Sequence, residues 1–118
     1  MIAHLVLFRP RADLPHADRE SLADAFGTAL SEIPSIRRAR VGRRVRLGRA
    51  YEALMRADYP YAAVLEFDDR AGLIAYLEHP AHEQLASRFF TAFEEALLYD
   101  FELADGAAGV AALLPDTR

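Results

Sequence analysis

The sequence predicts an α+β fold in which helices cover one face of a four-stranded antiparallel sheet. Three observations support this prediction. Segments with the two-residue periodicity of strands alternate with segments that have helical periodicity. Their order along the 118 residues is β-α-β-β-α-α-β, and this length fits a single domain. Several strands are apolar on both faces, so one helical layer would leave an apolar face uncovered.

The first strand is expected over residues 2–8, a short apolar run that Arg9-Pro10 ends. Because side chains alternate along a strand, His4 belongs to one face and Leu5 and Leu7 to the other. The residues that share the face of His4 are Ile2, Val6 and Phe8.

A helix is expected over residues 15–33, where Pro15 suits the first turn and Pro34 ends the helix. Its apolar residues form one stripe at helical spacing: Leu22, Ala25, Phe26, Ala29, Leu30 and Ile33. Gly27 lies in the middle of this helix, where glycine costs about 1 kcal/mol relative to alanine. We therefore expect Gly27 to mark a close approach of another segment.

Residues 36–47 alternate between apolar residues and arginines, which predicts a strand with one arginine face made of Arg38, Arg40, Arg44 and Arg46. Residues 37–49 contain seven arginines and no acid, whereas the rest of the chain has seven arginines against 18 acidic residues. Charge on an edge strand opposes unwanted strand pairing. We expect at least two of these arginines to pair with Asp or Glu of the dimer, in the same subunit or in its partner. An anionic small ligand and a nucleic acid are the alternatives.

The second half of the chain is predicted to contain a loop over residues 48–60 and a strand over residues 61–67. Asp68 or Asp69 then offers an N-cap for a short helix whose inward residues are Leu73, Ile74 and Leu77. His79-Pro80 ends that helix. A second helix is expected over residues 81–96, with an inward stripe of Leu85, Phe89, Phe93 and Ala96, and a last strand over residues 97–103.

This order fits the ferredoxin-like β-α-β-β-α-β plan with an antiparallel four-stranded sheet. In that plan the helices cover the sheet only once. A second copy packed on the face that carries Leu5 and Leu7 would cover the remaining apolar residues. The sequence therefore predicts a homodimer in the form of a dimeric α/β barrel.

Composition excludes several kinds of chemistry. The chain has no cysteine and no lysine, since all 14 basic residues are arginine. Thiol nucleophiles, Fe–S clusters and Schiff-base catalysis are therefore excluded. The first residues lack the features of a signal peptide and no apolar run is long enough to span a membrane, so we expect a cytoplasmic protein without a membrane partner.

Three segments resemble the stress-responsive A/B barrel (Dabb) family. The first is HLVLFRP over residues 4–10, the second is the Y-x-x-H-P-x-H element from Tyr76 to His82, and the third is LYDFE over residues 98–102. The resemblance covers residues 1–103, so residues 104–118 are expected to be a C-terminal extension. It implies a dimeric α+β barrel without a cofactor.

The resemblance also implies a site. In a polyketide cyclase of this family, a tyrosine and a histidine at the positions of Tyr76 and His82 serve an aldol-type ring closure, and a histidine at the position of His4 lines the same pocket. Asp100 matches an acid on the last strand and is expected to fix an imidazole tautomer. The residues expected to bind the substrate are His4, Val6, Phe8, Phe26, Phe93 and Asp100.

The residues themselves favour His82 as a base. It is expected in the first turn of a helix, where the positive end of the helix dipole disfavours a protonated imidazole. We expect a proton-transfer step, such as aldol cyclisation, isomerisation or a lyase reaction, on a small carbonyl or polyketide-like compound. The alternative is a non-catalytic, stress-responsive binding protein in which His79 and His82 only stabilise the junction at Pro80.

A metal site is not expected. His79 and His82 with Glu78 or Glu83 would supply ligands, but Pro80 places His79 before the helix and Glu83 points about 100° away from His82. Nucleic acid is not an expected partner either, because the body of the protein is acidic and no aromatic residues alternate with the arginines.

Overall fold

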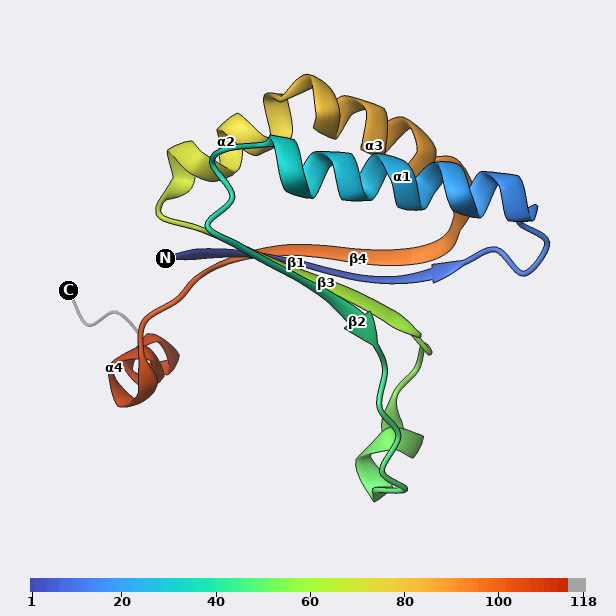
Figure 1. The fold of residues 1–118 in the computed structure, drawn as a ribbon. Helices are drawn as coiled ribbons and strands as arrows, with labels where there is room; N and C mark the ends of the chain where they lie inside the picture. The colour runs from blue at the N-terminus through green and yellow to red at the C-terminus, as the bar shows by residue number, and fades with distance from the viewer. Residues whose placement is uncertain (115–118) are drawn as a thin grey trace.

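The computed structural model describes residues 1–114, which form an antiparallel sheet of four strands. The sheet order is β2-β3-β1-β4, so β1 pairs with both β3 and β4 near the centre (Figure 1). The predicted ferredoxin-like α+β fold is therefore confirmed. The strands are β1 (Ile2–Pro10), β2 (Arg38–Arg43), β3 (Tyr61–Phe67) and β4 (Phe93–Glu102).

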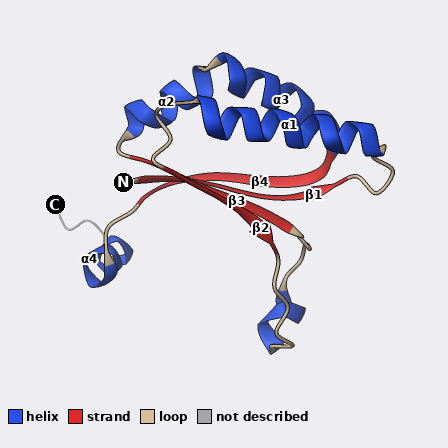
Figure 2. Cartoon of the chain, viewed as in Figure 1, coloured by secondary structure: helices blue, strands red, loops and turns tan. Residues whose placement is uncertain are grey.

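Three helices cover one face of the sheet, with α1 and α3 packed together above the strands (Figure 2). They are α1 (His16–Glu32), α2 (Arg70–Glu78) and α3 (Pro80–Ala92). A short helix, α4 (Gly106–Val110), lies on the other side of the sheet, and 3-10 turns occur at Ala50–Leu54 and Ala111–Leu113. Within residues 1–114, none of the helices combines the length and apolar character of a membrane span.

The hydrophobic core lies between the helices and the sheet. The alternation predicted for β1 and β3 is confirmed, because His4 and its neighbours on the same face are buried there. Ala29 from α1, Ile33 directly after it and Leu85 from α3 pack against these strands. The strand residues in the core are Ile2, Val6, Phe8, Ala63, Leu65 and Phe67.

The junction between α2 and α3 is set by two caps. The Asp69 side chain accepts a hydrogen bond from the Gly72 N–H at 2.9 Å and begins α2. His79 ends α2 and begins α3, because Pro80 follows it and its Nδ1 accepts from the Ala81 N–H at 3.0 Å. These caps fix the position of His82 in the first turn of α3.

The inward face of α2 differs in part from the prediction. Leu73 is buried as expected, but the second buried residue of this helix is Tyr76. Ile74 and Leu77 are 51% and 41% exposed. The helix has only nine residues, and a spacing of three places Tyr76, rather than Ile74, on the same face as Leu73.

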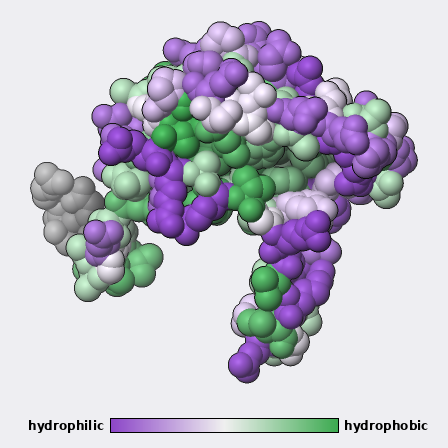
Figure 3. All heavy atoms as spheres, in the orientation of Figure 1, coloured by the Kyte–Doolittle hydropathy of each residue, from purple (hydrophilic) through white to green (hydrophobic). Residues whose placement is uncertain are grey.

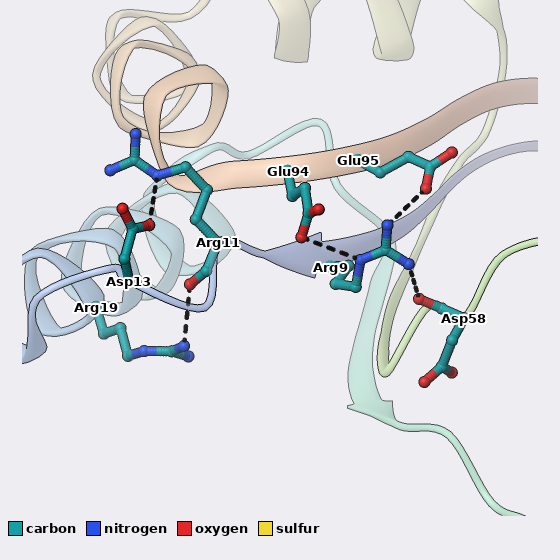
Figure 4. Close-up of polar contacts among 7 residues, drawn as sticks. All are labelled: Arg9, Arg11, Asp13, Arg19, Asp58, Glu94 and Glu95. Atoms are coloured by element: carbon teal, nitrogen blue, oxygen red, sulfur yellow. Dashed lines mark hydrogen bonds and ion pairs between the residues drawn. The ribbon is translucent and has the colours of Figure 1, made fainter.

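The boundary between α3 and β4 was predicted wrongly. The helix ends at Ala92 and the strand begins at Phe93, so Phe93 and Ala96 belong to β4. Pairing with β1 overrides the local helical spacing here, since Arg9 lies opposite Glu95 and Pro10 opposite Phe93. Arg9 also forms ion pairs with Glu94 at 3.5 Å and Glu95 at 2.9 Å, and Figure 4 shows both contacts.

β2 is shorter than predicted and ends at Arg43. The last contact of the ladder joins the Arg44 N–H to the Pro60 carbonyl at 2.9 Å, and residues 44–60 then leave the sheet. We call this excursion the arm; it projects away from the side that carries the helices (Figure 1). Arg44 and Arg46 therefore lie on the arm and not on a strand face with Arg38 and Arg40.

Asp58 holds the arm to the sheet. Its carboxylate accepts from Arg44 at 2.6 Å and lies 2.9 Å from Arg46, and its main-chain oxygen accepts from Arg9 at 3.0 Å. The hydrogen bond from Arg44 is the largest cause of a pKa below the usual value for Asp58. The expected pairing of at least two arginines with acids is confirmed by Arg44 and Arg46, within one copy of the chain. Arg38 and Arg40 form no ion pair within residues 1–114.

The face of the sheet opposite the helices, which we call the open face, is apolar at its centre. Tyr99 and Phe101 are 54% and 47% exposed on this face, and Leu5 lies directly between Val64 and Tyr99. Hydrophobic residues also gather on the arm and near α4 (Figure 3). The radius of gyration is 16.3 Å, against about 13.5 Å for a compact domain of this length. The arm and the tail therefore extend away from the core of their own chain.

The expected C-terminal extension begins after β4, where the Leu103 N–H donates to the Met1 carbonyl at 2.9 Å. Residues 104–114 then lead away from the sheet through α4 (Figure 1). Residues 115–118 of the extension lie outside the described residues.

We predict that the arginine-rich segment does not bind nucleic acid. Arg44 and Arg46 already share the carboxylate of Asp58, and the acidic remainder of the chain repels phosphate over a Debye length of roughly 10 Å. A titration with duplex or single-stranded DNA at low salt and micromolar protein should show no saturable binding. Salt-dependent binding that is lost in an Arg38→Ala/Arg40→Ala variant would contradict this prediction.

Candidate functional site

A cavity of about 190 Å³ lies between the sheet and the helices α2 and α3. Its polar groups are three of the residues that the sequence singled out: His4 from β1, Tyr76 from α2 and His82 from α3. The walls are apolar and consist of Val6, Phe26, Ala63, Leu65, Leu77, Leu85, Ala86, Phe89, Phe90 and Leu98. We call this space the polar cavity.

His4 is fixed from the neighbouring strand. It lies directly opposite Asp100 in the β1–β4 pairing, and its Nδ1 is 2.6 Å from an Asp100 carboxylate oxygen. His4 is 6% exposed, whereas the Asp100 side chain is about half exposed. With Nδ1 donating to Asp100, Nε2 of a neutral His4 ring is left as an acceptor. Asp100 therefore orients His4 without lining the polar cavity itself.

Tyr76 lies among aromatic rings and is 3% exposed. Its ring centroid is 5.8 Å from that of His4, 5.4 Å from that of Phe67 and 4.6 Å from that of His82. Burial raises the pKa of Tyr76 to about 12. The phenol therefore stays protonated at neutral pH and is available as a hydrogen-bond donor.

His82 is the third residue of α3 and is partly buried. Its ring meets the Tyr76 ring edge-on, with an interplanar angle of 63°. Burial is the largest cause of a lowered His82 pKa, and the electrostatic effect of the neighbouring His4 lowers it further. A backbone hydrogen bond at Leu77 acts in the opposite direction. The net effect favours a neutral His82 ring at neutral pH, which is the form that accepts a proton.

Three of the predicted substrate-binding residues do not line the polar cavity: Asp100, which contacts His4 from the next strand, and Phe8 and Phe93. Phe8 and Phe93 instead line a second cavity of about 350 Å³ between α1 and the sheet. Phe8 is two positions beyond Val6 on β1, and Phe93 opens β4 because α3 ends early, so both lie nearer the other end of the sheet. Phe26 borders both cavities.

Several wall residues of the polar cavity were not predicted from the sequence. Ala86, Phe89 and Phe90 follow His82 at spacings of four, seven and eight residues, which places them on the same side of α3. This helical spacing could have identified the three residues from the sequence. Leu98 offers no comparable signal, because its place opposite Val6 depends on the register between β1 and β4.

The side chains considered as metal ligands have other contacts or lie elsewhere. His79 Nδ1 accepts the hydrogen bond that caps α3, and Glu83 lies on the outer groove between α1 and α3 rather than in the polar cavity. Among residues 1–114, no group of three His, Asp or Glu side chains is arranged to hold a metal ion.

The sequence matches one family model, described as the stress responsive A/B barrel domain, over residues 2–103. The chain belongs to the Dabb family. A comparison of its sequence with curated proteins gave no match.

Solved structures with the Dabb-type fold are similar to this chain across most of its length. A dimeric ferredoxin-like protein from Thermobifida fusca has 24% identity and a TM-score of 0.66, with 86% of this chain and 90% of that chain covered. A hydroxynitrile lyase from Passiflora edulis has 22% identity and a TM-score of 0.72, with 89% and 94% covered. SnoaB from Streptomyces nogalater, a cofactor-independent oxygenase, has 15% identity and a TM-score of 0.63, with 90% and 95% covered. At these identities the likeness shows the fold.

Proposed function

We propose that this Dabb protein catalyses a proton-transfer step on a small carbonyl compound bound in the polar cavity. One observation carries the proposal: Tyr76 and His82 come from different helices, yet their ring centroids are 4.6 Å apart in a cavity that His4 also lines. If side chains filled the space beside the junction between α2 and α3, a purely structural role of Tyr76 and His82 would be favoured instead. The names of the lyase and the oxygenase with similar folds are consistent with an enzyme on this scaffold.

The proposed step uses the protonation states described above. The neutral His82 ring accepts a proton from the carbon next to the carbonyl, and the electron pair of the broken C–H bond moves into an enolate. The Tyr76 hydroxyl donates a hydrogen bond to the enolate oxygen, where negative charge develops. His82 then returns its proton, either to carbon in an isomerisation or to the new alkoxide after an aldol addition. His4, held by Asp100, contributes a second polar contact.

Deuterium exchange tests this step without knowledge of the natural substrate. Small ketones, aldehydes and 1,3-diketones that fit about 190 Å³ are incubated with the protein in D₂O, and NMR follows deuterium at the carbon next to the carbonyl. We expect exchange with at least one compound above the buffer rate. Tyr76→Phe should slow this exchange roughly 100- to 1,000-fold, as expected for the loss of one hydrogen bond to developing charge. Saturable binding of the compounds without exchange would favour the non-catalytic binding protein instead.

The pH dependence of the exchange rate is a separate prediction. Because the His82 pKa is lowered from 6.5, more than half of the His82 rings are still neutral at pH 6.5. The rate at pH 6.5 should therefore exceed half of its plateau and fall to half only at a more acidic pH. A rate that is already at half its plateau at pH 6.5 or above would contradict the assignment of His82 as the base.

We further infer that the functional unit is a homodimer formed through the open faces of residues 1–103. The apolar centre of that face and the extended arm leave hydrophobic side chains exposed in a single copy. Similar structures from Thermobifida fusca, Bacteroides fragilis and a Jannaschia species are described as dimeric. Face-to-face packing of two sheets would complete the expected barrel.

A further inference from the structure

The second cavity, which we call the aromatic cavity, is larger than the polar cavity and lies between α1 and the opposite end of the sheet. Its volume is about 350 Å³, within the range of small-molecule sites in proteins. The walls are almost entirely apolar, with four aromatic rings contributed by Phe8, Phe26, Tyr61 and Phe93. None of the polar residues of the proposed site, His4, Tyr76 or His82, lines it.

A wall of aromatic rings separates the two cavities. Phe8 lines the aromatic cavity and Phe89 the polar cavity, and their ring centroids are 5.9 Å apart. Phe26 borders both spaces and lies 6.5 Å from Phe8. The aromatic cavity is thus a separate space with its own lining, and an occupant there does not need to contact His82.

Helix α1 leaves this space open because it carries small residues there. Ala23 and Gly27 are one turn apart and both line the aromatic cavity. A Cβ added at Gly27 would have no atom within 4 Å, so the expected close approach of another segment at Gly27 is wrong. Glycine within a helix costs about 1 kcal/mol relative to alanine, and here it borders empty space.

Arg19 is the one charged residue among those that line the aromatic cavity. It precedes Ala23 by four residues and Gly27 by eight, so all three lie on one side of α1. Arg19 is exposed to solvent, and within residues 1–114 the only hydrogen bond of its side chain is a long one of 3.5 Å to the main-chain oxygen of Arg11 (Figure 4). The nearby Asp13 carboxylate instead contacts Arg11, at 3.6 Å, and no carboxylate among residues 1–114 lies within 4.0 Å of Arg19.

We propose that the aromatic cavity binds an amphipathic carboxylate, with its unbranched hydrocarbon chain among the aromatic rings and its carboxylate on Arg19. An apolar enclosure takes the chain through the hydrophobic effect, and a guanidinium without a protein carboxylate offers two parallel donors to the acid group. This proposal names a medium-chain fatty acid as the ligand class. It does not rest on the proton-transfer function of the polar cavity.

Calorimetric titration with butanoate, hexanoate and octanoate tests the proposal. Affinity should rise by up to about fourfold for each added methylene until the cavity is filled. Octan-1-ol, which has the same chain without the charge, should bind roughly tenfold more weakly than octanoate. Arg19→Gln should remove this difference, whereas Arg40→Gln, the same change at an exposed arginine outside the cavity, should leave it intact.

Variants that fill the aromatic cavity provide the second part of the test. Gly27→Leu should abolish binding of octanoate and octan-1-ol alike, and Ala23→Leu provides an independent filling variant. His82→Ala should bind octanoate as the parent does, and this result would hold even if no carbonyl compound exchanges deuterium. The proposal is overturned if octanoate shows no saturable binding, if octan-1-ol binds equally well, or if Gly27→Leu and Ala23→Leu leave octanoate binding unchanged.

Discussion

Replacing Tyr99 with glutamate is expected to convert the protein from a dimer of twice 13.2 kDa into a monomer. Tyr99 lies on the open face beside Leu5 and is 54% exposed in a single copy. In a face-to-face dimer it would be covered, and an unpaired carboxylate buried there costs several kcal/mol. The dissociation constant of the dimer should therefore rise roughly a thousandfold or more. Light scattering at micromolar concentration measures the change in mass, and the melting temperature should fall because the dimer no longer stabilises the fold.

A matched control is available on the helix side of the molecule. Ile74 on α2 is 51% exposed, so Ile74→Glu introduces the same charge at an apolar residue of similar exposure outside the open face. This variant should keep the mass of the parent. Parent protein that scatters as a 13.2 kDa monomer, or a Tyr99→Glu variant that remains dimeric, would contradict packing through the open face.

The parts of the fold that the sequence predicts well are those in which local pattern and tertiary contact agree. β3 occupies residues 61–67 as predicted, because its alternating pattern also matches its two-sided pairing in the sheet. The start of α3 follows from His79-Pro80, since proline limits the conformation of the residue before it. In both segments the local sequence is sufficient to set the structure.

The errors occur where a distant segment decides the outcome. Phe93 continues the helical stripe of Leu85 and Phe89, yet pairing with Pro10 of β1 places it in a strand. Likewise, the alternation of residues 36–47 continues beyond Arg43, but the partner strand β3 begins only at Tyr61, so residues 44–47 have no strand to pair with. Periodicity describes a segment alone and carries no information about where its partner begins.

In the candidate site, too, local features were predictable from the sequence and contacts between distant segments were not. The placement of His4 on the helix-covered face followed from alternation, and that of His82 in a first helical turn followed from Pro80. The 2.6 Å contact between His4 and Asp100 joins residues on two strands that are far apart in the sequence, and residue patterns alone do not give the register that aligns them. The split into two cavities was not predictable either, because it depends on how Phe8, Phe26 and Phe89 meet in space.

Replacing His82 with alanine is expected to lower the rate of deuterium exchange by about 10²- to 10⁴-fold, the usual contribution of a general base. The dimer should persist, and the melting temperature should change little, because His82 is only partly buried and its side chain does not cap α3. The substitution also removes a group whose pKa is lowered in the folded state. The parent should therefore lose stability as the pH falls through 6.5, where the unfolded chain takes up this proton first, and His82→Ala should lose less.

Two other histidines separate a catalytic role of His82 from a structural one. His16 is exposed and pairs only with Glu20 on the surface of α1, so His16→Ala should match the parent in both rate and stability. His79→Ala removes the N-cap of α3 and should cost about 1 kcal/mol of stability while its effect on the rate stays far smaller than that of His82→Ala. If His82→Ala instead exchanges as fast as the parent, His82 is not the base. If it loses as much stability as His79→Ala, its role is to hold the junction between α2 and α3.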